Sequence, residues 1–290
     1  MKVRRLGTIL ISIAATAAVG TASAAADHVP ADAKICKKRN QMGSDKGTVV
    51  HLGGGRHLYN AGGGNDTVYG GPKDDILNGG RGKDKVYGGG GNDVVCGGVG
   101  NDKVFGDKGR DKVYGEEDND RLVGGPDNDY INGQAGRDRL IGYGKKHGNP
   151  TDDGRDFLDG SFDADVLVAG GFDSLLGGAD NDKLSSKTED SPVKKMDGYI
   201  GDDRITGTDG NDKLLFGDIG DDTIRGGGGN DLIDGGGSND SLFGGDGDDS
   251  LLGNDGTDAL SGEGGVDDCN GGGGNHDTAD NTCESSPQVP

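Results

Sequence analysis

The sequence contains no tryptophan, and only 4% of its residues are aromatic. Glycine, by contrast, accounts for 63 of the 290 residues, whereas an ordinary globular protein contains about 7% glycine. A chain so poor in large apolar side chains cannot build one thick hydrophobic core. This shortage leaves two outcomes: disorder, or a repetitive architecture that needs only a thin core and has a second source of cohesion.

Positive charge is also scarce, because 30 Lys and Arg residues stand against 51 Asp and Glu residues, which gives a net charge of -21. A compact state with this charge repels itself unless counterions neutralise it. Nucleic acids and anionic membranes attract basic faces, so neither is an expected partner. The acidity indicates instead a chain that binds many cations.

Long apolar runs are absent except at the start of the chain, where an apolar stretch runs from Leu6 to Val19 behind a basic N-terminus. Small residues follow and allow cleavage after Ala24 or after Ala26. The stretch is too short to span a bilayer comfortably, which disfavours the alternative of a membrane anchor. Residues 1–26 are therefore predicted to be a secretory signal peptide, and the mature protein is expected to be extracellular with no membrane span.

From Gly62 onward, three residue types recur every nine residues in a fixed register. The first is aspartate, at Asp66, Asp75, Asp84, Asp93, Asp102, Asp111, Asp120, Asp129 and Asp138. Two positions after each comes a β-branched residue or leucine, at Val68, Leu77, Val86, Val95, Val104, Val113, Leu122, Ile131 and Leu140. Four positions after each Asp comes glycine, from Gly70 to Gly142. Such a register predicts a solenoid of nonapeptide units.

Each unit divides into a turn and a short strand. Six residues such as Gly88–Asp93 form the turn, in which glycines permit the positive φ angles that direct carbonyl groups toward one spot. The Asp adds an anionic oxygen, and a cage of carbonyl and carboxylate oxygens is what Ca²⁺ prefers. The next three residues, such as Val94–Cys96, form a strand whose middle side chain points inward. Two units make a coil of about 18 residues, and coils stack at about 4.8 Å.

Over most of the chain the pattern resembles the repeats-in-toxin, or haemolysin-type, calcium-binding nonapeptide GGxGxDxUx. The resemblance implies an all-β fold, a right-handed parallel β-roll or β-helix solenoid. It also implies that each Ca²⁺ is shared between the Asp of one turn and carbonyls of the turn two units later. Asp66 would then share an ion with the turn of Asp84, and Asp75 with the turn of Asp93.

Several turns depart from the glycine pattern. Lys73 takes the fourth position in the turn that ends at Asp75, and an aspartate takes it in the turns that end at Asp120 and Asp129. The second glycine is replaced by Asp107, Glu116 and Gln134 in three turns. Residues with a Cβ atom raise the cost of positive φ angles. We therefore expect weaker or partly filled sites in these turns.

Two insertions are predicted to interrupt the repeat. The first block covers residues 61–142, the second 154–184 and the third 198–270, with loops at 143–153 and 185–197 and a C-terminal cap or tail at 271–290. The second block contributes Asp156, Asp165, Asp173 and Asp182. The third contributes Asp203, Asp212, Asp222, Asp231, Asp240, Asp249, Asp258 and Asp267, with Leu214 among its expected inward residues. The three blocks can stack as one rod or hinge apart.

Residues 27–60 are predicted to be an N-terminal segment and cap, because Thr48 and His57 stand where the repeat has Asp. Terminal repeats are usually atypical. An alternative is that His51 and His57 bind a transition metal, although two histidines without a third ligand are thin support.

The aspartates of the three blocks are the predicted metal ligands, and they would hold several Ca²⁺ ions, roughly ten at about one per coil. Those ions bring a positive charge close in magnitude to the formal charge of -21. Without them, stacked carboxylates repel one another across a thin core, so folding is expected to be coupled to binding. The chain would be unfolded during export and fold outside, with the about 10⁻⁴–10⁻³ M affinities of extracellular modules.

The four cysteines contain no CxxC pair, and in an exported chain they favour disulfides. Cys269 stands at an inward position of the last regular unit, and Cys283 lies just beyond it, so this pair is predicted to close the C-terminal end. Cys36 with Cys96 then follows by elimination.

The outward residues of alternate units in the first block form two neighbouring columns. One is cationic, with Lys85, Lys103, Arg121 and Arg139, and the other is largely aromatic, with Tyr69, Tyr87 and Phe105 followed by Val123 and Ile141. The pair of columns suits a cell-surface glycan or a protein partner. The alternative is that the ladders only stabilise the sheet and offset the acidic turns.

The first functional hypothesis is a secreted calcium-binding protein with a structural or interaction role, such as a Ca²⁺-dependent adhesin or a glycan- or partner-binding module. The second is the remnant chaperone-like tail of an exported hydrolase, as found in enzymes of the resembling family. No HExxH or GxSxG motif occurs, and the five histidines are scattered. We therefore expect no enzymatic activity and no catalytic residues.

Overall fold

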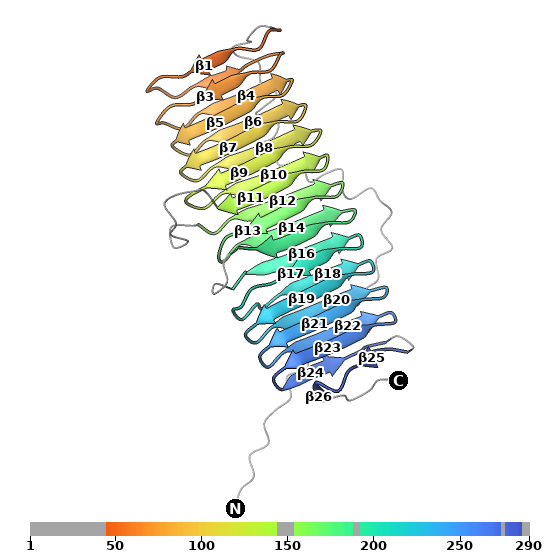
Figure 1. The fold of residues 1–290 in the computed structure, drawn as a ribbon. Coiled ribbons are helices and arrows are strands. Elements are labelled where there is room, and N and C mark those ends of the chain that lie inside the picture. Colours follow the sequence, from red (N-terminus) through yellow and green to blue (C-terminus); the bar gives the residue numbers. More distant parts are fainter. Residues whose placement is uncertain (1–44, 144–153, 188–191, 274–275, 286–290) are drawn as a thin grey trace, which may run out of the picture.

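The chain forms one β-solenoid in the computed structural model, which describes residues 45–143, 154–187, 192–273 and 276–285. Figure 1 shows the strands stacked as a single rod from β1 at one end to β26 at the other. Each strand pairs in parallel with the second strand along the chain, so that two 13-stranded sheets face each other. The predicted all-β parallel solenoid is thus confirmed. In the described part of the chain, no helix has the length and apolar character needed to cross a membrane.

The odd-numbered strands form one of the two faces, which we call the odd sheet. Its strands are β1 (Val49–His51), β3 (Thr67–Tyr69), β5 (Lys85–Gly90), β7 (Lys103–Lys108), β9 (Arg121–Gly125), β11 (Arg139–Tyr143), β13 (Val166–Ala169), β15 (Lys183–Ser186), β17 (Arg204–Thr206), β19 (Thr223–Gly228), β21 (Ser241–Asp246), β23 (Ala259–Gly264) and β25 (Thr278–Ala279).

The even-numbered strands form the opposite face, the even sheet. Its strands are β2 (Leu58–Asn60), β4 (Ile76–Arg81), β6 (Val94–Val99), β8 (Lys112–Glu117), β10 (Tyr130–Ala135), β12 (Phe157–Phe162), β14 (Ser174–Ala179), β16 (Lys195–Ile200), β18 (Leu215–Ile219), β20 (Leu232–Gly237), β22 (Ser250–Asp255), β24 (Asp267–Asn270) and β26 (Cys283–Ser285). Most strands exceed the expected three residues, because the pairing continues into the first half of the turn.

The core is one side chain thick. In β7, for example, Lys103 is exposed, Val104 is fully buried and Phe105 is half-buried, as the alternation along a strand requires. Val104 aligns with Val86 on one side and with Leu122 on the other, and the same inward file continues along the whole solenoid. Burying one such Val or Leu side chain contributes about 1.5–3 kcal/mol, so the file stabilises each coil only modestly.

Both sheets continue through the two interruptions of the repeat. Ile131 aligns with Leu158 across the first interruption, and Leu175 aligns with Met196 across the second. The blocks therefore form one rod rather than hinged pieces. The ten residues 144–153 of the first predicted loop lie outside the described residues.

The second predicted loop, 185–197, is partly wrong. Residues 183–186 belong to β15 and residues 195–200 belong to β16, and the fully buried Met196 takes an inward position. Val193 occupies the place that the repeat gives to Asp, and its amide donates to Asp212 in the next coil. The segment lacks the Asp and glycine signals of the repeat, yet its apolar side chains fill the coil in the same way.

A second correction concerns Leu214, which is only half-buried, whereas the neighbouring Leu215 is fully buried. The ten-residue step from Asp212 to Asp222 explains the shift, because its extra residue lies between Asp212 and the strand. Leu215 consequently aligns with Met196 and Ile233 in the inward file.

Both ends of the solenoid are capped. At the N-terminal end, β1 and β2 continue the coil as predicted, with Thr48 and His57 in the Asp positions. At the other end the predicted disulfide between Cys269 and Cys283 is confirmed, with 5.6 Å between their Cα atoms. Cys96 is fully buried beside Tyr114, and its predicted partner Cys36 lies outside the described residues.

Candidate metal-binding columns

The aspartates of the repeat line up in two columns, one on each edge of the solenoid. The odd column leads into the odd sheet and contains Asp66, Asp84, Asp102, Asp120, Asp138, Asp165, Asp182, Asp203, Asp222, Asp240, Asp258 and Asp277. The even column leads into the even sheet and contains Asp75, Asp93, Asp111, Asp129, Asp156, Asp173, Asp212, Asp231, Asp249 and Asp267, with Val193 between Asp173 and Asp212.

One carboxylate oxygen of each Asp is held by the preceding coil. The backbone N–H of Asp66 donates to Oδ1 of Asp84 at 2.6 Å, and the N–H of Asp84 donates to Oδ1 of Asp102 at 2.8 Å. At the N-terminal cap, the hydroxyl and the amide of Thr48 donate to Oδ1 of Asp66 in the same way. A donor in the preceding coil, usually the backbone N–H of its Asp, therefore orients every carboxylate in the column.

The second carboxylate oxygen is buried and has no hydrogen-bond partner in most of these residues. Among the described residues this applies to Oδ2 of Asp66, Asp84, Asp93, Asp102, Asp111, Asp120, Asp138, Asp165, Asp182, Asp203, Asp222, Asp231, Asp240, Asp249, Asp258, Asp267 and Asp277. Buried carboxylate oxygens are normally paired, and leaving one unsatisfied costs about 1–3 kcal/mol or more. So many unsatisfied oxygens in register indicate that a cation is the missing partner.

Backbone carbonyls lie beside these oxygens. An ideal Cβ built on Gly79 would lie 2.6 Å from Oδ2 of Asp84 and 2.6 Å from the carbonyl oxygen of Gly97 in the next coil. The same arrangement recurs at Gly88, where Oδ2 of Asp93 lies at 2.6 Å. Glycine is required at these positions because any side chain would fill the space between a carboxylate and a carbonyl.

Burial and mutual repulsion raise the pKa values of the aspartates. Burial, with the charges of Asp138 and Asp102, raises the pKa of Asp120 to about 9. Burial, with the charges of Asp138 and Asp182, raises the pKa of Asp165 to about 9. Stacked carboxylates of this kind cannot all be ionised near neutral pH unless a cation lies among them.

The donor set fits Ca²⁺. Within the described residues, no three His, Cys, Asp or Glu side chains converge on one metal position, so each site must be completed by backbone carbonyls. Carboxylate and carbonyl oxygens with flexible geometry are the ligands of Ca²⁺, whereas Zn²⁺ prefers His and Cys. The geometry also gives no support to a transition-metal site at the two N-terminal histidines, because His51 stacks on Tyr69 and Nδ1 of His57 lies 3.0 Å from Oδ1 of Asp75.

Three aspartates of the even column differ, because a hydrogen bond within their own turn occupies their Oδ2. The amide of Gly71 donates to Asp75 at 2.8 Å, and the amide of Gly170 donates to Asp173 at 2.7 Å. In the third turn the amide of Thr208 donates to Asp212 at 2.6 Å, and the Thr208 hydroxyl lies 3.1 Å from both carboxylate oxygens. These three positions were predicted from the sequence as ordinary ligands, and the structure distinguishes them from the rest.

The orientation of one peptide separates the two kinds of turn. In open turns the second residue has a positive φ angle, as at Gly80 and Gly98, and its N–H makes no hydrogen bond to Oδ2 of the Asp. Gly71 and Thr208 do not adopt positive φ. Thr208 is β-branched, which disfavours positive φ. Pro72 follows Gly71, but Gly125, which also precedes a proline, has a φ of 132°, so the proline alone does not close the turn. The turn of Gly170 is one residue short, which leaves no room for the usual geometry.

The substituted turns expected to be weaker keep the open geometry. Asp107, Glu116 and Gln134, which replace the second glycine, have φ angles of 70°, 85° and 74°. Asp118 and Asp127, at the fourth position, have φ angles of 75° and 81°. The backbone thus follows the repeat at a conformational cost of roughly 1–3 kcal/mol per residue. Of the turns with such substitutions, only the one that contains Lys73 is closed by a hydrogen bond to its own Asp.

Sequence reasoning missed one member of the odd column. Asp277 is buried, its Oδ1 accepts the amide of Asp258 at 3.0 Å, and its Oδ2 has no partner among the described residues. The ten-residue step from Asp267, followed by Ala279 two positions later, is the signal that identifies it. The same ten-residue step occurs between Asp212 and Asp222.

A family model described as RTX calcium-binding nonapeptide repeat (4 copies) matches the chain repeatedly. The matches cover residues 60–95, 97–131, 114–144, 151–176, 168–186, 197–215, 216–251 and 243–275. No curated protein matches the chain.

Proposed function

Because the chain belongs to the family of RTX calcium-binding nonapeptide repeats, which implies Ca²⁺ binding, we propose that it is an exported protein that folds when Ca²⁺ fills its Asp columns. Its ligands are then the aspartates of both columns together with the carbonyls of adjacent coils. The weakest ligands are Asp75, Asp173 and Asp212, whose Oδ2 atoms already accept a hydrogen bond within their own turn. Repeats of this family are typical of extracellular proteins, which supports export through the signal peptide predicted at residues 1–26.

The column of buried carboxylates is the observation that carries this proposal. The twelve aspartates of the odd column leave eleven intervals between successive coils, each flanked by two oxygens without a partner in the described residues. The odd column alone thus offers about as many intervals as the roughly ten ions expected at about one per coil, and the open aspartates of the even column add further intervals. Each ion would join two coils that otherwise repel each other.

The relative energies favour folding on binding. An ionised carboxylate buried without a partner costs several kcal/mol even after relaxation. Burial of an inward Val or Leu side chain stabilises the fold by about 1.5–3 kcal/mol. Each coil carries two Asp and two inward residues. The metal-free ionised solenoid is therefore unstable, and Ca²⁺ supplies the missing cohesion. A Ca²⁺-poor interior and a Ca²⁺-rich exterior would then confine the folded state to the outside of the cell.

Once folded, the rod serves a structural or interaction role rather than catalysis. The matched family is a repeat family without an enzymatic assignment, and the described residues consist of the solenoid and its caps. The two sheet faces are the broad surfaces that such a rod offers to a partner.

Far-UV circular dichroism of the mature chain tests this proposal. In chelator at pH 9 we expect a disordered spectrum, and with millimolar Ca²⁺ at the same pH a β-sheet spectrum. An equal concentration of Mg²⁺ is the control and should not induce the change, because its strict octahedral demand fits such turns poorly. A chain that is fully ordered in chelator at pH 9 would contradict the proposal.

A further inference from the structure

A hollow lies on the outer surface of the odd sheet over β5, β7, β9 and β11. The first residues of these strands, Lys85, Lys103, Arg121 and Arg139, are exposed and adjacent in register. We call them the cation column. The third residues form a parallel column, in which the ring of Tyr87 aligns with the ring of Tyr69 on one side and with that of Phe105 on the other.

The rings of the second column form a continuous stack that ends at Phe105. The centroids of His51 and Tyr69 are 4.5 Å apart, those of Tyr69 and Tyr87 are 4.9 Å apart, and those of Tyr87 and Phe105 are 4.7 Å apart. All three pairs are parallel within 6°. The next two positions are Val123 and Ile141, so no described ring covers the second face of Phe105.

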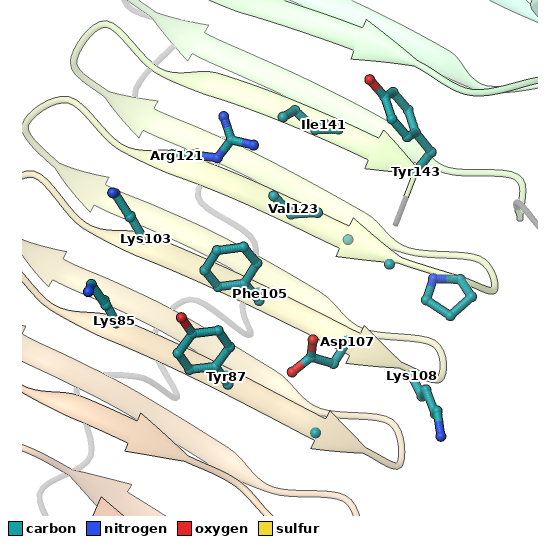
Figure 2. A pocket seen from close by; sticks show the side chains of 14 residues that line it. Lys85, Tyr87, Lys103, Phe105, Asp107, Lys108, Arg121, Val123, Ile141 and Tyr143 are labelled. Carbon is teal, nitrogen blue, oxygen red and sulfur yellow. The ribbon is translucent and has the colours of Figure 1, made fainter. Parts of the chain in front are cut away.

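The end of the stack opens a hollow of about 780 Å³. Figure 2 shows its arrangement: Lys85, Lys103 and Arg121 form one side, the row from Tyr87 through Phe105, Val123 and Ile141 forms the floor, and Asp107 and Lys108 form the opposite side. Tyr143 closes the far end. An apolar floor with a few charged groups along its rim is the usual composition of a ligand site.

The cations of the rim have no partner within the described protein. No described carboxylate lies within 4.0 Å of Lys85, Lys103 or Arg121, and none of the three stacks on a ring. By contrast, Arg225 farther along the same sheet lies 4.0 Å from the centroid of Phe243. Like charges directly opposite on neighbouring strands destabilise a sheet. An anion from outside that bridges the cation column would relieve this repulsion.

We propose that this hollow binds an acidic polysaccharide, a chain of uronate-type sugars that runs along the axis of the rod. Its carboxylates pair with Lys103 and Arg121, one sugar ring lies over Val123 beside the open end of the ring stack, and its hydroxyls donate to Asp107. The site rests on the proposed function, because the stacking of coils that Ca²⁺ permits creates both columns.

The spacing of the charges selects this class of ligand. The cations repeat once per coil, at about 4.8 Å, and a polyuronate likewise carries one carboxylate on each sugar along its length. An extended acidic peptide presents side chains to one side at every second residue, about 6.6 Å apart, and falls out of register after one step. Single-stranded nucleic acid binds by stacking bases on open ring faces, and within the hollow the stack leaves only one face of Phe105 open among the described rings.

Calorimetric titration of Ca²⁺-saturated protein with a short oligogalacturonate tests the proposal. The Ca²⁺ concentration is held constant, and a blank titration into buffer accounts for Ca²⁺ bound by the sugar. We expect binding that weakens with added salt and no binding of a neutral oligosaccharide of equal length. Lys103→Gln combined with Arg121→Gln should weaken binding at least about tenfold.

A matched control exists on the same sheet. Lys183 and Arg204 are exposed first residues of adjacent strands, aligned in register as Lys103 and Arg121 are, but their third-position neighbours are Ser185 and Thr206. Lys183→Gln combined with Arg204→Gln removes the same charge and should change affinity less than about twofold. If both double variants weaken binding equally, the hollow is not the site.

A second variant tests the hollow without changing any charge. Val123→Phe extends the ring stack, fills the space beside Phe105 and should abolish binding while the Ca²⁺-induced circular dichroism change is retained. Unchanged binding by this variant would overturn the proposal, as would tighter binding of poly-glutamate than of oligogalacturonate, or a Ca²⁺-folded wild type that binds no uronate. Absence of any Ca²⁺-induced folding would instead contradict the proposed function itself.

Discussion

The two Asp columns share one repeat but differ along their length. The odd column runs without interruption from Asp66 to Asp277, and every one of its aspartates has a buried Oδ2 without a partner in the described residues. The even column is interrupted near its start by Asp75 and at its centre by Asp173, Val193 and Asp212.

The difference follows the conformation of the second turn residue. In the turns of Gly80 and Gly98 a positive φ leaves the carboxylate oxygen without a partner, whereas the N–H groups of Gly71 and Thr208, which lack positive φ, donate to that oxygen. The β-branched Thr208 and the shortened turn before Asp173 are the local causes in two of the three turns. A closed turn is satisfied without metal, so it can hold the coil together at the points where the repeat is irregular.

Removal of Ca²⁺ has the largest expected effect, and it acts through the open aspartates. Their folded pKa values, about 9 for Asp120 and Asp165 and about 7 for Asp93, exceed the unfolded value of about 3.9. Protonation therefore stabilises the metal-free solenoid fully below pH about 4, and this stability is lost as the pH rises through about 7–9. Circular dichroism in chelator should show β-structure at pH 5.5 and its loss by pH 9.

The Ca²⁺-bound protein should show the opposite dependence, because protons compete with Ca²⁺ for the same oxygens. The Ca²⁺ concentration at half-saturation, followed by calorimetric titration, should rise as the pH falls from 8 to 5.5. A midpoint that is independent of pH would indicate that these carboxylates are not the ligands.

Removal of one carboxylate from the odd column has the next largest expected effect. Asp120→Asn should destabilise the Ca²⁺-bound state by about 3 kcal/mol, because two neighbouring intervals lose a charged ligand. The matched variant Asp173→Asn, in a closed turn, should cost about 1 kcal/mol. Urea unfolding in excess Ca²⁺ measures both, and equal effects would remove the distinction between open and closed turns.

Loss of the terminal disulfide should have a smaller and local effect. Replacement of Cys269 and Cys283 by alanine releases a loop with a sequence separation of 14 residues, which contains Asp277. We expect about 2 kcal/mol of lost protection in the last coil and a weaker last interval of the odd column. Hydrogen exchange measures this, with the amides of β3 to β11 in the same molecule as the reference. A loss of protection spread over the whole rod would contradict a local role.

Opening a closed turn should have the smallest effect. Thr208→Gly permits positive φ and frees Oδ2 of Asp212, so one additional Ca²⁺ should bind. The stabilisation that the added ion brings is offset by the roughly 1 kcal/mol entropic cost of the new glycine. The free energy of unfolding should therefore change little. Metal analysis of the dialysed protein counts the ions, and Thr206→Gly in the neighbouring strand is the control. An unchanged ion count would show that the peptide orientation does not limit binding.

The sequence by itself determined the period, the inward file and the identity of nearly every Asp in the columns. These features are local: a nine-residue register of Asp, β-branched residue or leucine, and glycine specifies turn, strand and facing direction within each unit. The same reasoning identified the Cys269–Cys283 bridge, because both residues lie at the end of the last coil.

Only the tertiary structure decided which aspartates are open, that Met196 and Leu215 complete the inward file, and that Asp277 extends the odd column. It also revealed the hollow beside Phe105. Each of these depends on contacts between coils about 18 residues apart or on the orientation of a single peptide. The pattern of residue types within one nonapeptide contains neither kind of information, because the residues that contact each side chain come from neighbouring coils.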